Sequence, residues 1–188
     1  VVLLGRIPPQ SRQIETDEDI NIATYCLKQV GLEGYEKRNY LTLSGGEQQR
    51  VHFARVLAQI SVSKQMVNLK KTEFREDNGI ATSLNCEALI QDRLLLLDEP
   101  TSSLDIAHQH QTLKIVKDLL KNNLSCIAIL HDLNLAAQYA DKILILDQGR
   151  VAAFGKPEDI LTSEILSKAF GHQIHVMRHP HLNCALII

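Results

Sequence analysis

Residues 94–105 read LLLLDEPTSSLD, and this stretch decides the fold class of the chain. Its apolar half is typical of a buried parallel strand, and it ends in two acids, Asp98 and Glu99. Ligands of open α/β sheets bind outside the carboxyl ends of such strands. A carboxylate there can hold Mg²⁺, directly or through water, and the next acid can orient an attacking water. Taken alone, the letters also fit a strand end with two solvated acids.

The chain beyond this strand alternates apolar strands with helices, which predicts a parallel α/β sheet. The expected helices cover residues 106–121, 132–140, 157–161 and 163–170. The expected strands cover residues 125–130, 142–146 and 150–154, the last two as an antiparallel hairpin. His131 directly follows the expected strand 125–130, so it should lie at the same sheet edge as Glu99.

Residues 43–50, LSGGEQQR, lie upstream and precede an expected helix over residues 47–60, with Ser44 as its cap. Backbone N–H groups at a helix start have no intrahelical partner, and glycines let a phosphate approach them closely. Taken alone, Ser44-Gly45-Gly46 favours an ordinary capped helix start. A further helix is expected over residues 17–31, with acids in its first turn and Gly31 at its end.

Residues 61–91 differ from their surroundings, because they are rich in charge and show no sustained period. We interpret them as an insertion with a possible helix over residues 84–91. The other histidines give weaker indications of function. His108 and His110 do not share a helix face and are expected to be solvated. The C-terminal histidines are irregularly spaced and interrupted by Pro180, which argues against a metal site.

The bulk properties exclude several classes of protein. The 188 residues suffice for one domain, and a net charge of −2 offers no basic field for nucleic acid. The four cysteines lie far apart, which favours reduced thiols in the cytosol over a disulfide framework. No apolar run is long enough for a membrane span, and the start lacks both Met and a signal-peptide pattern. Any link to a membrane is therefore expected to go through a partner.

In this order, the motifs resemble those of ABC-transporter ATPase subunits. LSGGEQQR is similar to the signature motif, LLLLDEP to the Walker B strand, SSLD to the D-loop, and His131 to the H-loop histidine. The resemblance implies that Glu99 is the general base, that His131 contacts the γ-phosphate and positions water, and that Asp98 serves Mg²⁺. It also implies a group of residues that contact ATP bound by a second subunit or communicate across the dimer: Ser44, Gly45, Gly46, Glu47 and Asp105.

The sequence departs from the pattern of these ATPase subunits in one respect. The P-loop pattern G-x-x-x-x-G-K-[ST] is absent, and the one Gly-Lys pair, Gly155-Lys156, is followed by Pro157. We therefore expect an α/β, P-loop NTPase-like ABC ATPase domain with a helical subdomain, incomplete at its N-terminus. Its expected parts are the helical subdomain at about 12–60, the insertion at 61–91 and the Walker B and H-loop part at 92–188. Alone, such a chain should bind Mg-ATP poorly and not turn it over.

Within this family, the GR-x-P start, the sequence EQQRVHFARVLAQI and the insertion are similar to the ATPases of iron-complex and cobalamin importers, especially those for haem. This implies a homodimer at the cytoplasmic face of the bacterial inner membrane, bound to permease subunits and served indirectly by a periplasmic substrate-binding protein. Ferric siderophore and cobalamin remain alternative cargoes. A non-catalytic interaction module remains an alternative function, and a soluble ABC ATPase of translation or DNA repair is disfavoured by the absence of tandem cassettes.

Overall fold

The computed structural model describes residues 1–6, 15–61, 93–122 and 124–188. The helices are α1 (Asp17–Gln29), α2 (Gly45–Ile60), α4 (Ile106–Leu119), α5 (Leu133–Tyr139), α6 (Pro157–Ile160) and α7 (Ser163–Phe170), with short 3-10 turns η1 (Val2–Gly5), η2 (Tyr40–Thr42) and η4 (Leu120–Asn122). The strands are β1 (Arg93–Asp98), β2 (Leu124–Ile129), β3 (Ile143–Asp147), β4 (Arg150–Gly155), β5 (Val176–Arg178) and β6 (Ala185–Ile187). The expected insertion, with its helix over 84–91, falls outside the described residues except for Ser61.

The two N-terminal helices begin at capping boxes, in which a side chain and a backbone group satisfy each other. Thr16 and Asp19 form the box of α1, and Ser44 and Glu47 form that of α2. The second box confirms Ser44 as the cap and starts α2 two residues earlier than predicted. Gly31 lies just beyond α1 with a φ of 72°, as a helix stop requires.

The predicted parallel pairing is confirmed between β1 and β2, whose register joins Asp98 to Ile129. The expected strand over residues 142–146 does not extend this pair. Instead, β3 pairs antiparallel with β4, as predicted for a hairpin. The turn explains this arrangement, because Gln148 and Gly149 have φ values of 47° and 75° and reverse the chain within two residues.

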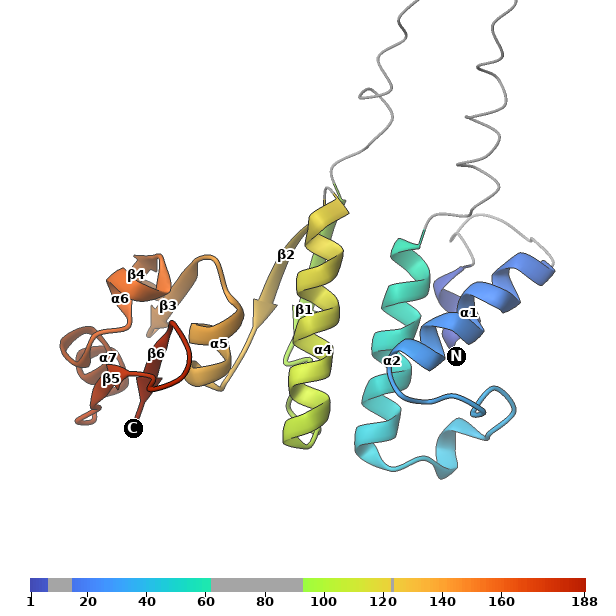
Figure 1. Cartoon of the computed structure of the whole chain (residues 1–188), viewed down its shortest axis with the longest axis horizontal. Helices are drawn as coiled ribbons and strands as arrows, with labels where there is room; N and C mark the ends of the chain where they lie inside the picture. Colours follow the sequence, from blue (N-terminus) through green and yellow to red (C-terminus); the bar gives the residue numbers. More distant parts are fainter. Residues whose placement is uncertain (7–14, 62–92, 123) are drawn as a thin grey trace, which may run out of the picture.

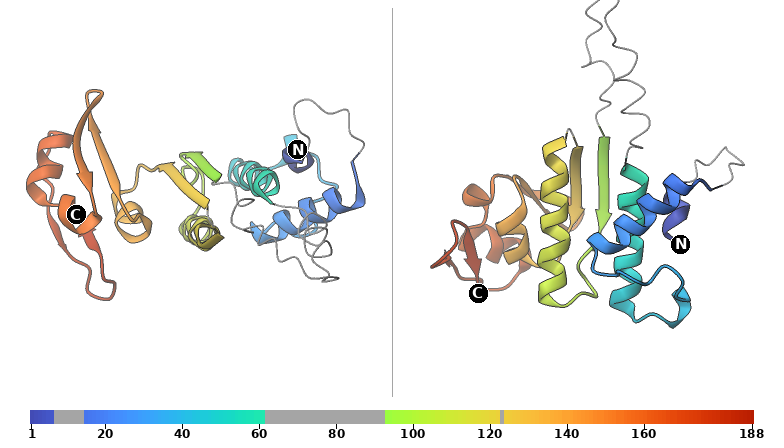
Figure 2. Two further views of the ribbon diagram at one scale, coloured as in Figure 1. Left: turned by 90° about the horizontal axis from the view of Figure 1, so that it is seen from above. Right: turned by 45° about the vertical axis from the view of Figure 1, so that its right-hand side comes forward.

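One face of the β1–β2 pair is covered and the other is open. Leu95 and Leu97 are buried in a first core cluster that also includes α1, α2 and Val116 of α4. Figures 1 and 2 show α4 lying along this face. The apolar side chains of the opposite face are more than half exposed: Leu94, Leu96, Ile127 and Ile129.

A second core cluster lies in the C-terminal part and includes Ile145, Ile160 and Leu166. Its outer layer is a hairpin of β5 and β6 that the sequence did not predict. Asn134 of α5 fixes this hairpin by bonding both the N–H and the carbonyl of Ile187. Among the described residues, no helix has the length and apolarity needed to cross a bilayer.

Candidate functional site

The predicted pair of Glu99 and His131 meets at the carboxyl ends of β1 and β2. Because the two strands are parallel neighbours, the residues that follow them are placed at one edge. His131 Nε2 lies 2.6 Å from Glu99 Oε1, and the side chains are 74% and 43% exposed respectively. At this distance the ring nitrogen and the carboxylate oxygen are in direct polar contact. The arrangement leaves one edge of an exposed carboxylate open to solvent.

The backbone of Glu99 is held in an unusual conformation. Its φ is 46°, in the left-handed region that residues other than glycine rarely adopt. Its N–H continues the sheet by donating to Ile129 O at 3.2 Å. Its carbonyl accepts from the Ser102 N–H at 3.2 Å, the Ser102 hydroxyl at 3.1 Å and the Gln49 side chain at 2.8 Å. The surroundings thus fix a strained residue at the predicted base.

Asp98, the predicted Mg²⁺ residue, is the last residue of β1 and is exposed. No hydrogen bond to its carboxylate is found in the parts of the chain that the structure describes. Carboxylate oxygens are the ligands that Mg²⁺ prefers, and Mg²⁺ keeps several waters. An exposed, unengaged carboxylate beside Glu99 therefore fits a water-mediated Mg²⁺ position.

The signature segment lies at the start of α2, with Ser44 and Gly45 exposed. An added Cβ at Gly45 would meet nothing within 4 Å, whereas one at Gly46 would lie 2.9 Å from the Ser103 carbonyl oxygen. Gly46 is thus a point of close backbone approach between α2 and the loop after β1. The open side of the segment presents the first N–H groups of the helix, which have no intrahelical acceptor.

Glu47 faces the protein and not the open side. Its Oε2 accepts from the Ser44 N–H at 2.8 Å, and its Oε1 accepts from the Tyr35 hydroxyl at 2.7 Å. The Ser44 N–H, then the Tyr35 hydroxyl, lower the pKa of this carboxyl to about 2. Both oxygens are engaged, so the structure supports a role for Glu47 in shaping the signature loop.

Asp105 caps α4. It also takes part in a second contact between α2 and the loop that follows β1. Its Oδ1 accepts from the His108 N–H at 2.9 Å and lies 2.8 Å from His108 Nδ1. These hydrogen bonds with His108 lower the pKa of the Asp105 carboxyl. His108 Nε2 contacts Arg50 Nη1 of α2. Because a guanidinium only donates, Nε2 must accept, and the proton then sits on Nδ1 facing Asp105.

The expectation that His108 and His110 are solvated was wrong for both residues. His108 is bound between Asp105 and Arg50, and His110 Nδ1 lies 2.9 Å from the Tyr139 hydroxyl. The helix faces of the two histidines differ, as predicted, but each face meets another element. Only tertiary packing decides this, so the spacing along one helix could not reveal it.

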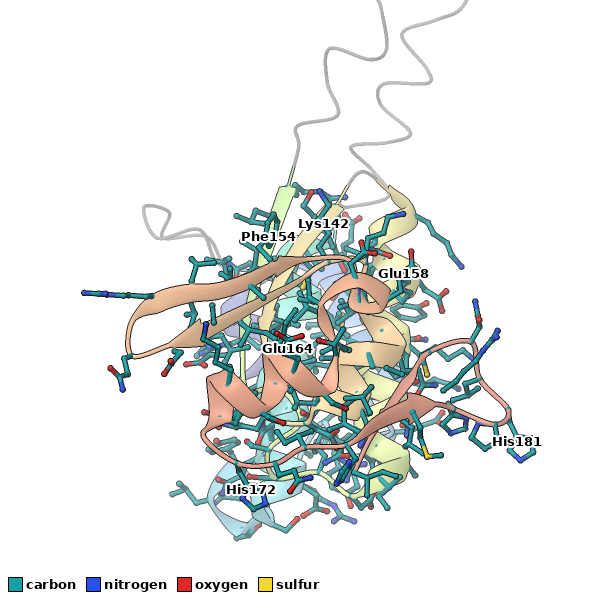
Figure 3. All side chains as sticks on the ribbon, turned by 90° about the vertical axis from the view of Figure 1, so that its left-hand side faces the viewer. Lys142, Phe154, Glu158, Glu164, His172 and His181 are labelled. Atoms are coloured by element: carbon teal, nitrogen blue, oxygen red, sulfur yellow. The ribbon has the colours of Figure 1, made fainter. Side chains whose placement is uncertain are left out.

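The C-terminal histidines do not gather into one group. His172 and His181 lie well apart in Figure 3. The rings of His179 and His181 are 6.3 Å apart, and His179 Nδ1 already accepts from the His181 N–H. Across the described residues, no three groups of His, Cys, Asp or Glu are placed to hold a metal ion.

Sequence reasoning assigned no individual role to Gln49, Arg50 or Tyr35. Gln49 and Arg50 belong to the signature motif, and the available signal was their place on the helix. Gln49 lies three residues after Gly46, hence on the same face. Tyr35 lies in a connector without periodicity, and no pattern pointed to it.

Curated relatives match the chain along its length, although no family model matches it. It is 50% identical over its 188 residues to the hemin import ATP-binding protein HmuV of Deinococcus radiodurans, of which it covers 61%. It is 46% identical over 96% of its length to the protein of that name from Plesiomonas shigelloides, covering 63% of it. For the Gloeobacter violaceus protein, the identity is 43% and the coverage is 100% of the chain and 59% of the relative. The chain thus spans about three fifths of these relatives.

Solved structures of ABC transporter proteins are also similar to this chain. A chain of an inward-facing ABC transporter assigned to the metal-chelate type matches 99% of this chain and 62% of its own length, with a TM-score of 0.68 and 26% identity. A dimeric bacterial ABC transporter cassette matches 82% of this chain and 54% of its own length, with a TM-score of 0.60 and 25% identity.

The fold is therefore similar to that of ABC transporter cassettes. This confirms the fold class predicted from the motifs. Within that class, the chain is similar along its full length to the hemin import ATP-binding proteins.

Proposed function

We propose that this chain provides the hydrolytic edge and the signature segment of an ATP-hydrolysing subunit in an ABC importer. The observation that carries the proposal is the Glu99–His131 pair at the ends of two adjacent parallel strands. An exposed carboxylate fixed by a histidine can accept a proton from a water that attacks a phosphate. His131 occupies Oε1, so Oε2 of Glu99 is the oxygen that takes the proton.

The remaining predicted residues divide between the metal and a second nucleotide. Asp98 would hold Mg²⁺ through water, and the ion would neutralise charge on the phosphates. Ser44, Gly45 and Gly46 would contact the γ-phosphate of ATP bound by the other subunit of a dimer, with Glu47 supporting their loop. Asp105 would communicate between the two sites. A dimeric cassette among the similar structures supports this arrangement.

The cargo that we propose is haem, because the similar curated proteins are hemin import ATP-binding proteins. The subunit would act at the cytoplasmic face of the inner membrane of a bacterium. Permease subunits would form the pathway, and a periplasmic binding protein would deliver the haem. Ferric siderophore and cobalamin are the competing cargoes.

The hydrolytic proposal is tested in a polypeptide completed with a segment that carries the phosphate-binding pattern G-x-x-x-x-G-K-[ST]. Glu99→Gln should retain ATP binding, accumulate an ATP-bound dimer and lose at least about 10²-fold in kcat, because the amide cannot accept the proton. Phosphate release and size-exclusion chromatography with ATP measure these effects. Glu158→Gln, at an exposed position of α6, is the matched control. Undiminished hydrolysis in Glu99→Gln would exclude Glu99 as the base.

The chain by itself should not turn over ATP, because its sequence contains no G-x-x-x-x-G-K-[ST]. Phosphate release from the purified 188-residue chain with Mg-ATP should equal the buffer background. Sustained turnover that Glu99→Gln abolishes would show that another part of the chain holds the phosphates.

The cargo is tested by growth of a haem-uptake mutant that lacks its own importer ATPase. The completed protein and its cognate permease should restore growth on hemin as the iron source. Restoration only on a ferric siderophore, or only of cobalamin uptake, would reassign the cargo while leaving the ATPase assignment intact.

A further inference from the structure

The side chain of Gln49 crosses from α2 to the loop after β1. Its Nε2 donates to the carbonyl oxygen of Glu99 at 2.8 Å and lies 3.5 Å from the Ser102 hydroxyl. The residues it joins are fifty positions apart in the sequence, so the bond is a tertiary link. No other side chain of α2 donates to Glu99 within the described residues.

The bond reaches a residue whose conformation needs support. Glu99 has a φ of 46°, and its carbonyl accepts two further hydrogen bonds from Ser102. Those two bonds come from the same loop and move with it. The bond from Gln49 comes from a separate helix, so among the described residues it is the hydrogen bond that ties the Glu99 peptide to α2.

The same face of α2 carries the signature segment. Gly46 lies one turn before Gln49, and an added Cβ at Gly46 would be 2.9 Å from Ser103 O. The helix therefore rests on the 99–103 loop at two points, one at each end of a single turn. A rotation or shift of α2 that followed a γ-phosphate contact at Ser44 would be transmitted to the Glu99 peptide.

We propose that Gln49 is a positioning residue that sets the orientation of Glu99 and couples it to the signature helix. The proposal rests on the proposed role of Glu99 as general base. Gln49 itself does not face the reacting atoms. Its contribution is to keep the Glu99 peptide, and with it the carboxylate beside His131, in one geometry.

The structural half is tested by hydrogen exchange in the 188-residue chain. Gln49→Glu keeps the size of the side chain but replaces the donor with an oxygen that repels the carbonyl. The amides of residue 99 and of residues 101–104 should exchange several-fold faster in Gln49→Glu and Gln49→Ala than in the parent. Gln59→Ala, at an exposed position of the same helix, should leave them unchanged. Unchanged exchange in both Gln49 variants, with α2 intact, would overturn the proposal.

The functional half is tested in the completed polypeptide. Both Gln49 variants should lower kcat about tenfold and leave the KM for ATP within about twofold, because a displaced base slows chemistry and not binding. Wild-type kcat in Gln49→Glu, or a loss confined to KM, would overturn the positioning role. If the parent itself does not hydrolyse ATP, the proposed function fails, and the exchange measurement still decides whether Gln49 holds the loop.

Discussion

Gly45 and Gly46 are adjacent, yet the structure places different demands on them. An alanine methyl at position 45 would enter open space, whereas one at position 46 would press on the backbone oxygen of Ser103. Gly45→Ala should therefore stabilise the chain by up to about 1 kcal/mol through helix propensity. Gly46→Ala should destabilise it by about 1–3 kcal/mol through overpacking. Urea denaturation measures both, and equal stabilities of the two variants would contradict the close approach.

Glu47 gives the chain a pH dependence of known sign. Its pKa is about 2 in the fold against an ordinary 4.5, chiefly because the Ser44 N–H and the Tyr35 hydroxyl donate to it. The unfolded state binds the proton more readily, so the stabilisation is present above about pH 4.5 and lost as the pH falls towards about 2. Glu47→Gln should thus be less stable than the parent near neutral pH, with the difference shrinking over that window.

Urea denaturation of the parent and Glu47→Gln at several pH values between about 5 and 3 checks this sign. Glu164→Gln provides the control, since Glu164 is also an exposed acid in the first turn of a helix. A difference between the parent and Glu47→Gln that grows as the pH falls would contradict the capping role.

At the residue scale, sequence patterns could place Glu99 and His131 together because both follow apolar strands and parallel strands end at one edge. Ser44 was equally accessible, since a cap is a local device. The contacts of His108, Gln49 and Tyr35 were not accessible, because each joins segments brought together by tertiary packing. The direction of Glu47 was also missed. A motif letter shows that a residue belongs to a functional segment, but not which way its side chain points.

At the scale of elements, β1 has one face buried in the core and the other face exposed. Leu95 is 3% exposed and packs in the first core cluster, whereas Leu96 is 66% exposed. Leu95→Ala should cost about 2–5 kcal/mol of the free energy of unfolding. Leu96→Ala should stay within about 0.5 kcal/mol of the parent. Thermal and urea denaturation measure both, and a large loss in Leu96→Ala would show that the open face is covered in solution.

Element boundaries followed the local signals closely where caps and turns exist. The Gln148-Gly149 turn and the caps at Ser44, Asp105 and Asp132 all lie where the pattern indicated an element end. The β5–β6 hairpin was missed because its strands are only three residues long, which is too short to show an alternating pattern. Such short strands are defined by the partner they meet, here α5.

At the scale of the whole molecule, two core clusters divide the chain. The first spans η1, α1, α2, β1 and α4, and the second spans α5, β3, α6, α7 and the C-terminal hairpin. Polar contacts join the two parts. His110 of α4 bonds the hydroxyl of Tyr139 in α5 at 2.9 Å, and Lys117 pairs with Asp141 at 2.6 Å. Exposed ion pairs contribute little, so the two clusters should unfold with distinct stabilities.

This division predicts regional effects of core substitutions. Leu166 and Leu32 are both fully buried, one in each cluster. Leu166→Ala should lower the local stability of α5–β6 by about 2–5 kcal/mol while α2 keeps its protection, and Leu32→Ala should do the reverse. Hydrogen exchange read by mass spectrometry resolves the two regions. If either variant loosened both clusters equally, the chain would be one cooperative unit, and the polar contacts between α4 and the C-terminal part would be stronger than their exposure implies.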